Sequence, residues 1–249
     1  MSLQYSPLES ERFNLRIFRG STDTLAPKEL LSTILDERID VAILRLPTSE
    51  QHTLAQLGSL LPFPVVVADT LVRFDGDLRS FPAQPMRNAQ LLSRRATAAD
   101  REVLEELVDI SFKDYRTHYN SNPLFDPSLV LQGYKEWALS CLEPGDERVC
   151  FLFYAGEQAV AFTTNTVHAE YGEGIVFGAR PNAPVRGIYT DLIRHTKQYM
   201  QDQGLRRVRA TTQVQNHGVQ RVWVREGLFP ARSYCTIHIN ALLTQRLHR

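Results

Sequence analysis

One short stretch, "APVRGIYTDLIRH" at residues 183–195, has the composition of a phosphate-binding turn that opens a helix. The start of a helix offers unpaired backbone N–H groups and the positive end of the helix dipole, and both attract anions. Arg186 is in addition a natural partner for phosphate. An ordinary helix start after a loop would look similar, so the surrounding elements have to decide between the two interpretations.

The part of the chain that would position this turn reads as a mixture of strands and helices. Hydrophobic periodicity, caps and turn residues predict strands at 91–97, 148–155, 158–169, 172–181, 206–214 and 231–240, and helices after Thr97 and at 128–142, 188–203 and 216–227. Thr97 with Asp100 resembles a capping box, and Gly204 and Gly227 are suited to ending helices.

The N-terminal part reads as a smaller α/β unit. Its patterns predict strands at 13–20, 39–46 and 63–78 and helices at 26–37 and 49–61. The segment 79–90 has two prolines and few core residues, which is typical of a linker. We therefore expect two domains, 1–85 and 86–249.

The order of elements from residue 91 onward resembles the Gcn5-related N-acetyltransferase (GNAT) superfamily. Its members carry Gln/Arg-x-x-Gly-x-Gly/Ala between a strand and a helix, and "PVRGIY" aligns with Gly187 at the middle glycine. Pro184 replaces the usual Gln or Arg, and Tyr189 replaces the small residue. The resemblance implies an α/β (α+β) GNAT fold, a mixed central sheet flanked by helices. It also implies that acetyl-CoA binds as acyl donor at Val185, Arg186, Gly187, Ile188 and Tyr189.

A second GNAT signature follows the next strand. Family members carry Asn-x-x-Ala-x-x-x-Tyr-x-x-x-Gly-Phe, and here Asn216, Trp223 and Gly227 fall at those intervals. Asn216 and Trp223 are seven residues apart and so share a helix face. The resemblance implies that both contact the cofactor. The family tyrosine protonates the leaving thiolate, but an indole N–H cannot act as a general acid at neutral pH. A core tryptophan is the second interpretation of Trp223.

The same resemblance points to a strand beside the cofactor loop. In GNAT enzymes a backbone N–H of this strand polarises the thioester carbonyl, as an oxyanion-stabilising donor does. By resemblance the strand is 175–179, and the contacting residues are Val176, Phe177 and Gly178. Gly178 would allow close approach.

Proton transfer needs side chains that the motif does not supply. His118 in the loop 115–127, and His168 and Glu170 near the turn before strand 172–181, are the candidate general bases. Each could equally be a surface residue. Tyr234 on the last strand could replace the missing tyrosine as acid, or the thiolate could depart directly without an acid.

A narrower resemblance concerns the acceptor. Two-domain amino-sugar acetyltransferases similar to dTDP-fucosamine acetyltransferase have sequences like "LESERFNLRIFR" (8–19), "YRTHYNSNPLF" (115–125) and "YKEW" (134–137). This implies transfer of an acetyl group to a small primary amine, first of all a nucleotide-linked amino sugar. An amino acid or peptide amine is a second possible acceptor. Two further hypotheses stay open: a non-catalytic GNAT-fold binding module and a two-domain α/β protein unrelated to the superfamily.

Composition narrows the partners further. Lysine plus arginine (28) equals aspartate plus glutamate (28), so no global basic field attracts nucleic acid or a membrane surface. Three scattered cysteines, Cys141, Cys150 and Cys235, form neither a disulfide framework nor a metal site. No long apolar segment is present, so we expect a cytoplasmic protein. A symmetric homodimer is the default expectation for an oligomer.

Overall fold

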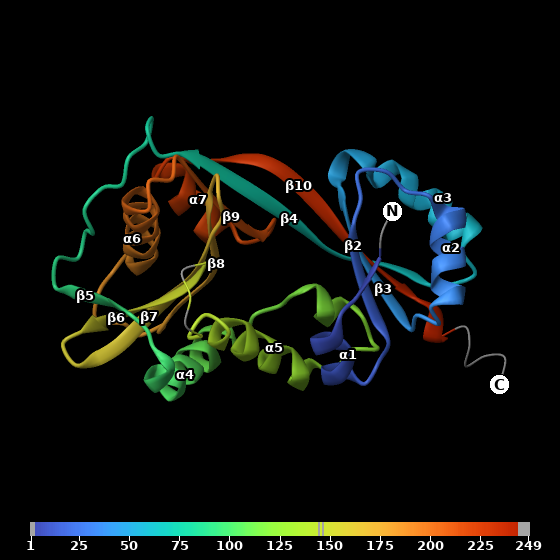
Figure 1. Cartoon of the computed structure of the whole chain (residues 1–249), viewed down its shortest axis with the longest axis horizontal. Helices are drawn as coiled ribbons and strands as arrows, with labels where there is room; N and C mark the ends of the chain where they lie inside the picture. Colours follow the sequence, from blue (N-terminus) through green and yellow to red (C-terminus); the bar gives the residue numbers. More distant parts are fainter. Residues whose placement is uncertain (1–2, 144, 146, 244–249) are drawn as a thin grey trace. The chain divides into compact units, whose positions relative to one another are not determined.

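The computed structural model describes residues 3–143, 145 and 147–243 (Figure 1). Contacts divide the chain into two units, each described here by itself. Unit 1 comprises Met1–Leu71, Arg116–Gly133 and Arg232–Arg249, and unit 2 comprises Val72–Tyr115 and Tyr134–Ala231. The contact-based units therefore differ from the predicted division at 85/86, which remains a prediction.

Unit 1 is built on the strand order β1-β2-β3-β10-β4. Its elements are β1 (Gln4–Tyr5), α1 (Pro7–Phe13), β2 (Ile17–Ser21), α2 (Pro27–Asp36), β3 (Val41–Pro47), η1 (Thr48–Thr53), α3 (Leu54–Leu60), η3 (His118–Ser121) and parts of β4 (Val65–Asp77), α5 (Pro127–Leu139) and β10 (Leu228–Asn240). The strand predicted at 13–20 begins only at Ile17. Phe13 instead ends α1, and Asn14 closes that helix in the left-handed conformation (φ 51°).

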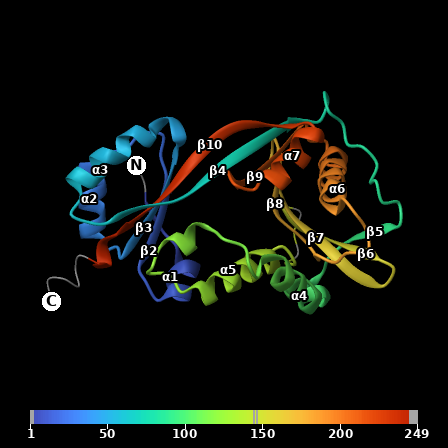
Figure 2. The ribbon, with the colours of Figure 1, turned by 180° about the vertical axis from the view of Figure 1, so that it is seen from behind.

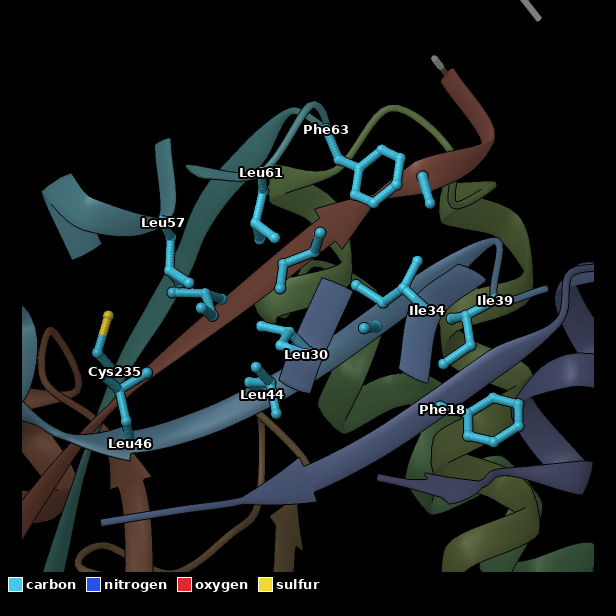
Figure 3. Close-up of a cluster of buried hydrophobic side chains, with 14 residues drawn as sticks. Phe18, Leu30, Ile34, Ile39, Leu44, Leu46, Leu57, Leu61, Phe63 and Cys235 are labelled. Atoms are coloured by element: carbon cyan, nitrogen blue, oxygen red, sulfur yellow. The ribbon is translucent and has the colours of Figure 1, made fainter. Parts of the chain in front are cut away.

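One sheet face of unit 1 carries its hydrophobic core (Figure 3). β10 and β3 pair antiparallel, with Cys235 opposite Leu46 and Ile237 opposite Leu44. These side chains pack with residues of α2 and α3, among them Leu30, Ile34 and Leu57. Alternation along a strand places its other residues on the opposite face. On β10 those residues are all polar: Tyr234, Thr236, His238 and Asn240.

Unit 2 has the strand order β4-β9-β8-β7-β6-β5. Its elements are the later part of β4, β5 (Leu91–Arg95), η2 (Ala98–Asp100), α4 (Arg101–Phe112), the end of α5, β6 (Arg148–Ala155), β7 (Gln158–Val167), β8 (Gly172–Ala179), α6 (Ile188–Asp202), β9 (Arg207–Gln213), α7 (His217–Arg225) and the start of β10. The predicted elements of this region are confirmed, with shifts of a few residues at their ends. Thr97 and Asp100 form the expected capping box.

Helices cover both faces of the unit 2 sheet (Figure 2). On one face Ile188 and Leu192 of α6 pack against Phe153 and Val160. On the other face Phe112 of α4 contacts Phe162, with 6.4 Å between the ring centroids. The α/β fold with a mixed sheet is therefore confirmed, because β8 and β9 pair parallel whereas β6, β7 and β8 pair antiparallel.

The cysteines and the helices bear on two further expectations. Cys141, Cys150 and Cys235 are all buried, and none of them forms a disulfide. Over the part of the chain that is described, no helix combines the length and the apolar character needed to cross a membrane.

Candidate active site

Strand β8 departs from regular geometry at its middle. It pairs with β7 through Thr164–Val176 and Asn165–Gly174, which leaves Ile175 as an extra residue in a β-bulge. In the described residues, the pairing of β8 with β9 ends at Gly174–Ala210. Beyond that point the two parallel strands no longer form a ladder. The bulge therefore lies where β8 parts from β9.

The bulge decides which backbone groups of β8 face the side on which β8 parts from β9. The Val176 N–H donates to Thr164 Oγ1 of β7 (3.0 Å), so Val176 points its polar backbone groups toward β7. Successive residues of a strand alternate, which turns the N–H and C=O of Phe177 the other way. Of the three predicted residues, Phe177 is thus the one whose N–H faces away from β7.

The predicted phosphate-binding turn opens α6 directly after this strand. Gly187 is the N-cap of α6, in the left-handed conformation (φ 73°). Its position is open: a Cβ there would meet only Arg87 Nη1, at 3.9 Å. Val185 and Ile188 are buried on either side and anchor the turn in the core, whereas Arg186 is exposed. The turn is thus anchored in the core on both sides, with Arg186 and Arg87 beside it.

Segment 79–90, predicted only as a linker, lies along α6. The Asp191 carboxylate, fully buried in the first turn of α6, accepts from the Arg87 N–H (2.5 Å) and from Asn88 Nδ2 (2.5 Å). Asn88 Nδ2 also donates to the Arg186 carbonyl (3.0 Å), which ties the segment to the turn itself. No motif marks Arg87, so sequence reasoning does not find it.

The same segment is held further along the helix by buried charge. Lys197 Nζ, 1% exposed as a residue, donates to the carbonyls of Glu226 (2.6 Å) and Pro82 (3.3 Å). Burial lowers the pKa of Lys197. Arg194 binds the Glu226 carboxylate with two nitrogens at 2.9 Å and the Pro85 carbonyl at 2.8 Å. This network fixes segment 79–90 and, through it, the start of α6.

Two tyrosines lie where β8 and β9 part. The Tyr189 hydroxyl donates to the Phe177 carbonyl (3.4 Å), so the residue that departs from the GNAT motif packs back on β8. Tyr115 binds the Gln213 side chain at the end of β9. Burial, and then the nearby Tyr115, raise the pKa of Tyr189. Sequence reasoning does not single out Tyr115, because only its loop resembles an acceptor-binding segment.

Trp223 and Asn216 have mainly structural contacts. Trp223 is 5% exposed and packs edge-on against Phe74, with 5.3 Å between centroids. Asn216 is the N-cap of α7, and its side chain donates to Thr212 Oγ1 (3.0 Å). These positions show Trp223 as a core residue of unit 2, and the predicted cofactor contacts of both residues remain predictions.

His168 and Glu170 precede β8, whereas Gly187 follows it. His168 stacks on Tyr171 (4.4 Å between centroids), and its Nε2 lies 3.9 Å from the Glu173 carboxylate. Glu170 lines a cavity of about 680 Å³, together with charged residues that include Asp75, Asp77, Arg79, Arg206 and Arg207. The eight residues of β8 span roughly 25 Å. Both candidate bases therefore lie at the opposite end of β8 from the turn, and their roles stay predictions.

His118 and Tyr234 belong to unit 1. His118 is buried, and its Nδ1 lies 2.9 Å from His238 Nε2. Burial and the neighbouring His238 hold the pKa of His118 well below its usual value. Tyr234 lies on β10, opposite Pro47. Their predicted roles as base and acid are not decided by these contacts.

A known protein family matches the part of the chain that holds this geometry. The family model for the acetyltransferase (GNAT) family matches residues 104–228, half of the chain. This range includes β8, the turn at Gly187 and all of α6. The chain belongs to the GNAT family.

Solved structures share the fold over most of the chain. A GCN5-related N-acetyltransferase from Kribbella flavida has a TM-score of 0.59 at 13% identity, covering 89% of this chain and 81% of its own. A functionally unknown conserved protein from Staphylococcus epidermidis has a TM-score of 0.61 at 12% identity, with coverages of 90% and 83%. A GNAT-family acetyltransferase from Colwellia psychrerythraea has a TM-score of 0.52 at 12% identity, with coverages of 85% and 71%. No curated protein matches in sequence. At these identities the likeness concerns the fold alone.

Proposed function

We propose that this protein transfers an acetyl group from acetyl-CoA to a small primary amine. The observation that carries the proposal is the left-handed Gly187, which opens the 15-residue helix α6 directly after the strand that parts from β9. A helix start of this kind presents backbone N–H donors to a diphosphate. The family membership supports the same reaction class.

The residues present fit acetyl-CoA. Its diphosphate needs N–H donors and positive charge, which the turn offers through Gly187, Ile188 and Tyr189 and through the guanidinium groups of Arg186 and Arg87. The pantetheine amides need a strand edge, which β8 offers beyond Gly174. The Tyr189 hydroxyl donates one hydrogen bond to the Phe177 carbonyl oxygen. A carbonyl oxygen accepts two hydrogen bonds, so one acceptor position remains for a pantetheine amide.

When bound, acetyl-CoA supplies an acetyl thioester. The amine nitrogen bonds to the thioester carbonyl carbon, the C–S bond breaks, and the proton lost by the amine is balanced by one gained at sulfur. The Phe177 N–H polarises the carbonyl oxygen, because it faces away from β7. We assign the proton donor for sulfur to Tyr115, since Trp223 is buried in the core and is no acid. Single substitutions will test three candidate general bases, His118, His168 and Glu170. A substitution of Tyr234 will test it as a second candidate acid.

We further propose a nucleotide-linked amino sugar as the first acceptor to test. Tyr134 stacks on Phe112 (4.7 Å between centroids, 16° between planes), and Trp137 beside it is 50% exposed. An exposed indole next to a stacked aromatic pair suits a sugar ring or a base. Amino acids and peptide amines form the comparison panel.

The test is a calorimetric titration of acetyl-CoA into the whole chain and into a matched pair of variants. Gly187 and Gly204 lie at opposite ends of α6, both with left-handed φ (73° and 76°) and with room for a methyl group. Gly187→Ala and Gly204→Ala therefore introduce the same backbone strain. Only Gly187→Ala should weaken acetyl-CoA binding, by about tenfold or more, because only it displaces the N–H donors.

The competing function is a binding module that transfers nothing. The burial of Trp223 at the position of the family's tyrosine favours it. Binding of acetyl-CoA without turnover of any amine in the panel would select this competing function. Loss of binding in both glycine variants alike would show that the turn at Gly187 is not the cofactor site.

A further inference from the structure

The polar face of unit 1 lies opposite its hydrophobic core. It is defined here as Arg19 of β2, Arg45 of β3, Asp69 of β4 and Thr236 and His238 of β10. Thr236 and Arg45 are directly opposite each other in the β10–β3 register, and Arg19 pairs with Ile43 in the β2–β3 register. Asp69 of β4 interacts with Thr236 and Arg45, so it lies next to them. The five side chains therefore stand together on one sheet face.

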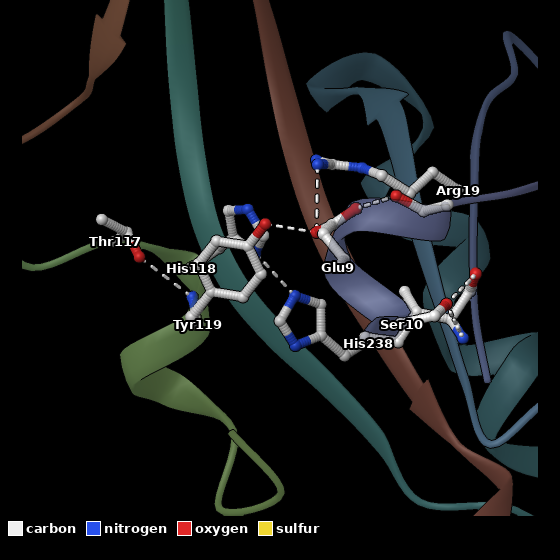
Figure 4. Close-up of polar contacts among 9 residues, drawn as sticks. Glu9, Ser10, Arg19, Thr117, His118, Tyr119 and His238 are labelled. Atoms are coloured by element: carbon white, nitrogen blue, oxygen red, sulfur yellow. Dashed lines mark hydrogen bonds and ion pairs between the residues drawn. The ribbon is translucent and has the colours of Figure 1, made fainter. Parts of the chain in front are cut away.

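The α1 helix and the η3 segment supply partners to one part of this face (Figure 4). The Glu9 carboxylate binds Arg19 Nη1 at 3.2 Å and accepts from the Tyr119 hydroxyl. His238 contacts His118 at 2.9 Å and Asn122 at 3.0 Å. Arg19, Glu9 and the two histidines thus satisfy one another within the protein.

The other part of the face lacks hydrogen bonds of this kind. Arg45 Nε, both carboxylate oxygens of Asp69 and the Thr236 hydroxyl are buried atoms without a hydrogen bond from the described residues. Thr236 and Arg45 lie close enough to Asp69 to favour its charged form, yet the carboxylate has no hydrogen bond of ordinary length and angle to either. Buried polar groups in native proteins are nearly always satisfied, so a clustered set of this kind points to an absent partner.

The charges restrict what that partner is. Arg19 is balanced by Glu9, and Arg45 by Asp69. Burial holds His238 neutral by lowering its pKa to about 3. Burial also raises the pKa of Asp69 and lowers that of Arg45, so a second net charge would be unfavourable here. An isolated phosphate would face Asp69, and an isolated amine would face two arginines.

We propose that Arg45, Asp69 and Thr236 form a binding site in unit 1 for a neutral polyhydroxylated ligand, a sugar or cyclitol ring. A hydroxyl group both donates and accepts. Adjacent hydroxyls can therefore donate to Asp69 while accepting from Arg45 and from Thr236. The site uses only groups of unit 1, and it goes beyond acetyl transfer.

The test measures binding of N-acetyl-D-glucosamine, D-glucose and myo-inositol to the full chain by saturation-transfer NMR and calorimetry, without acetyl-CoA. Inorganic phosphate and putrescine are the charged comparison probes. Saturable binding of at least one neutral probe, and of neither charged probe, is expected. Binding of the charged probes alone, or of none of the five, would overturn the proposal.

Two variants locate the site. Thr236→Val removes a buried hydroxyl with almost no change of shape and should weaken binding about tenfold, whereas Thr24→Val, at an exposed position of the same unit, should not. The double variant Arg45→Met with Asp69→Leu should lose binding and keep or raise Tm, because it removes both unpartnered groups together.

These variants also separate binding from a structural role. If Thr236→Val and the double variant lower Tm and bind the neutral probe as tightly as the native chain, the polar groups serve the fold and the proposal fails. If the double variant does not fold, the affinity of Thr236→Val relative to Thr24→Val decides alone.

Discussion

The two units place their unusual features at different levels of structure. In unit 2 helices pack on both faces of the sheet, and the departures from regularity are in the backbone: the bulge at Ile175, the parting of β8 from β9 and the left-handed Gly187. In unit 1 the backbone of β3 and β10 pairs regularly, and the departures are in side chains, polar on one sheet face. Backbone geometry depends on few side chains, so Pro184 and Tyr189 are compatible with a GNAT fold.

The largest effect on stability is expected from substitutions in the hydrophobic cores of the two units. Leu30 in unit 1 and Leu192 in unit 2 are both fully buried. Leu30→Ala and Leu192→Ala should each lower the free energy of unfolding by about 2–5 kcal/mol. Urea unfolding, monitored by hydrogen exchange in each unit, measures this loss of stability. Exchange that rises only in the mutated unit would show separate unfolding, whereas a rise in both would show one cooperative transition.

A second prediction concerns the network that fixes segment 79–90 on α6. Asp191→Ala leaves the Arg87 N–H and the Asn88 amide without their acceptor, at a cost of about 1 kcal/mol for each of these part-buried hydrogen bonds. Unfolding midpoints in urea measure the loss. Acetyl-CoA affinity should fall as well, because Asn88 also holds the Arg186 carbonyl. An unchanged affinity would show that segment 79–90 does not support acetyl-CoA binding at the turn.

The buried histidines predict a loss of stability in acid. Burial lowers the pKa of His195 in unit 2 to about 4 and that of His238 in unit 1 to about 3. The unfolded chain takes up protons below its ordinary histidine pKa of about 6.5, and the folded chain does so only near those lower values. The free energy of unfolding should therefore fall as pH drops from about 6.5 toward 4, by on the order of 2 kcal/mol for each histidine.

The variant His195→Leu separates the acid sensitivity of unit 2 from that of unit 1. The ring lies among Phe151 and Phe153, so an apolar side chain should be accommodated there. Urea unfolding at pH 7 and pH 4.5 should show a smaller pH dependence in the variant than in the native chain. An identical dependence would assign the acid sensitivity to unit 1 alone.

The smallest effect is expected on the surface of unit 2. Arg101 and Glu105 form an exposed i,i+4 ion pair with 3.2 Å between charged atoms. Glu105→Gln should cost only about 0.3–0.5 kcal/mol, and less at high salt. Thermal unfolding at two salt concentrations checks this. A loss above about 1 kcal/mol would mean that this pair has partners beyond the helix.

Local sequence signals anticipate much of unit 2. The Thr97 capping box, the glycines at 204 and 227 and the turn before α6 are predictable because each depends on residues only a few positions apart. The strand predicted at 13–20 is partly wrong, because Asn14 adopts a left-handed conformation that alternation of side chains does not reveal. The predicted site residues span both units, and local patterns cannot show this.

The sequence by itself determined the order of most elements from residue 91 onward, the α/β class, the family resemblance and the position of the turn at Gly187. These follow from periodicity and from residues that end or cap helices. The tertiary structure alone decided that Asp191 holds segment 79–90, that Trp223 lies in the core, and that Arg45, Asp69 and Thr236 meet on one sheet face. Such groups come from strands far apart in the chain, and only strand pairing and register bring them together.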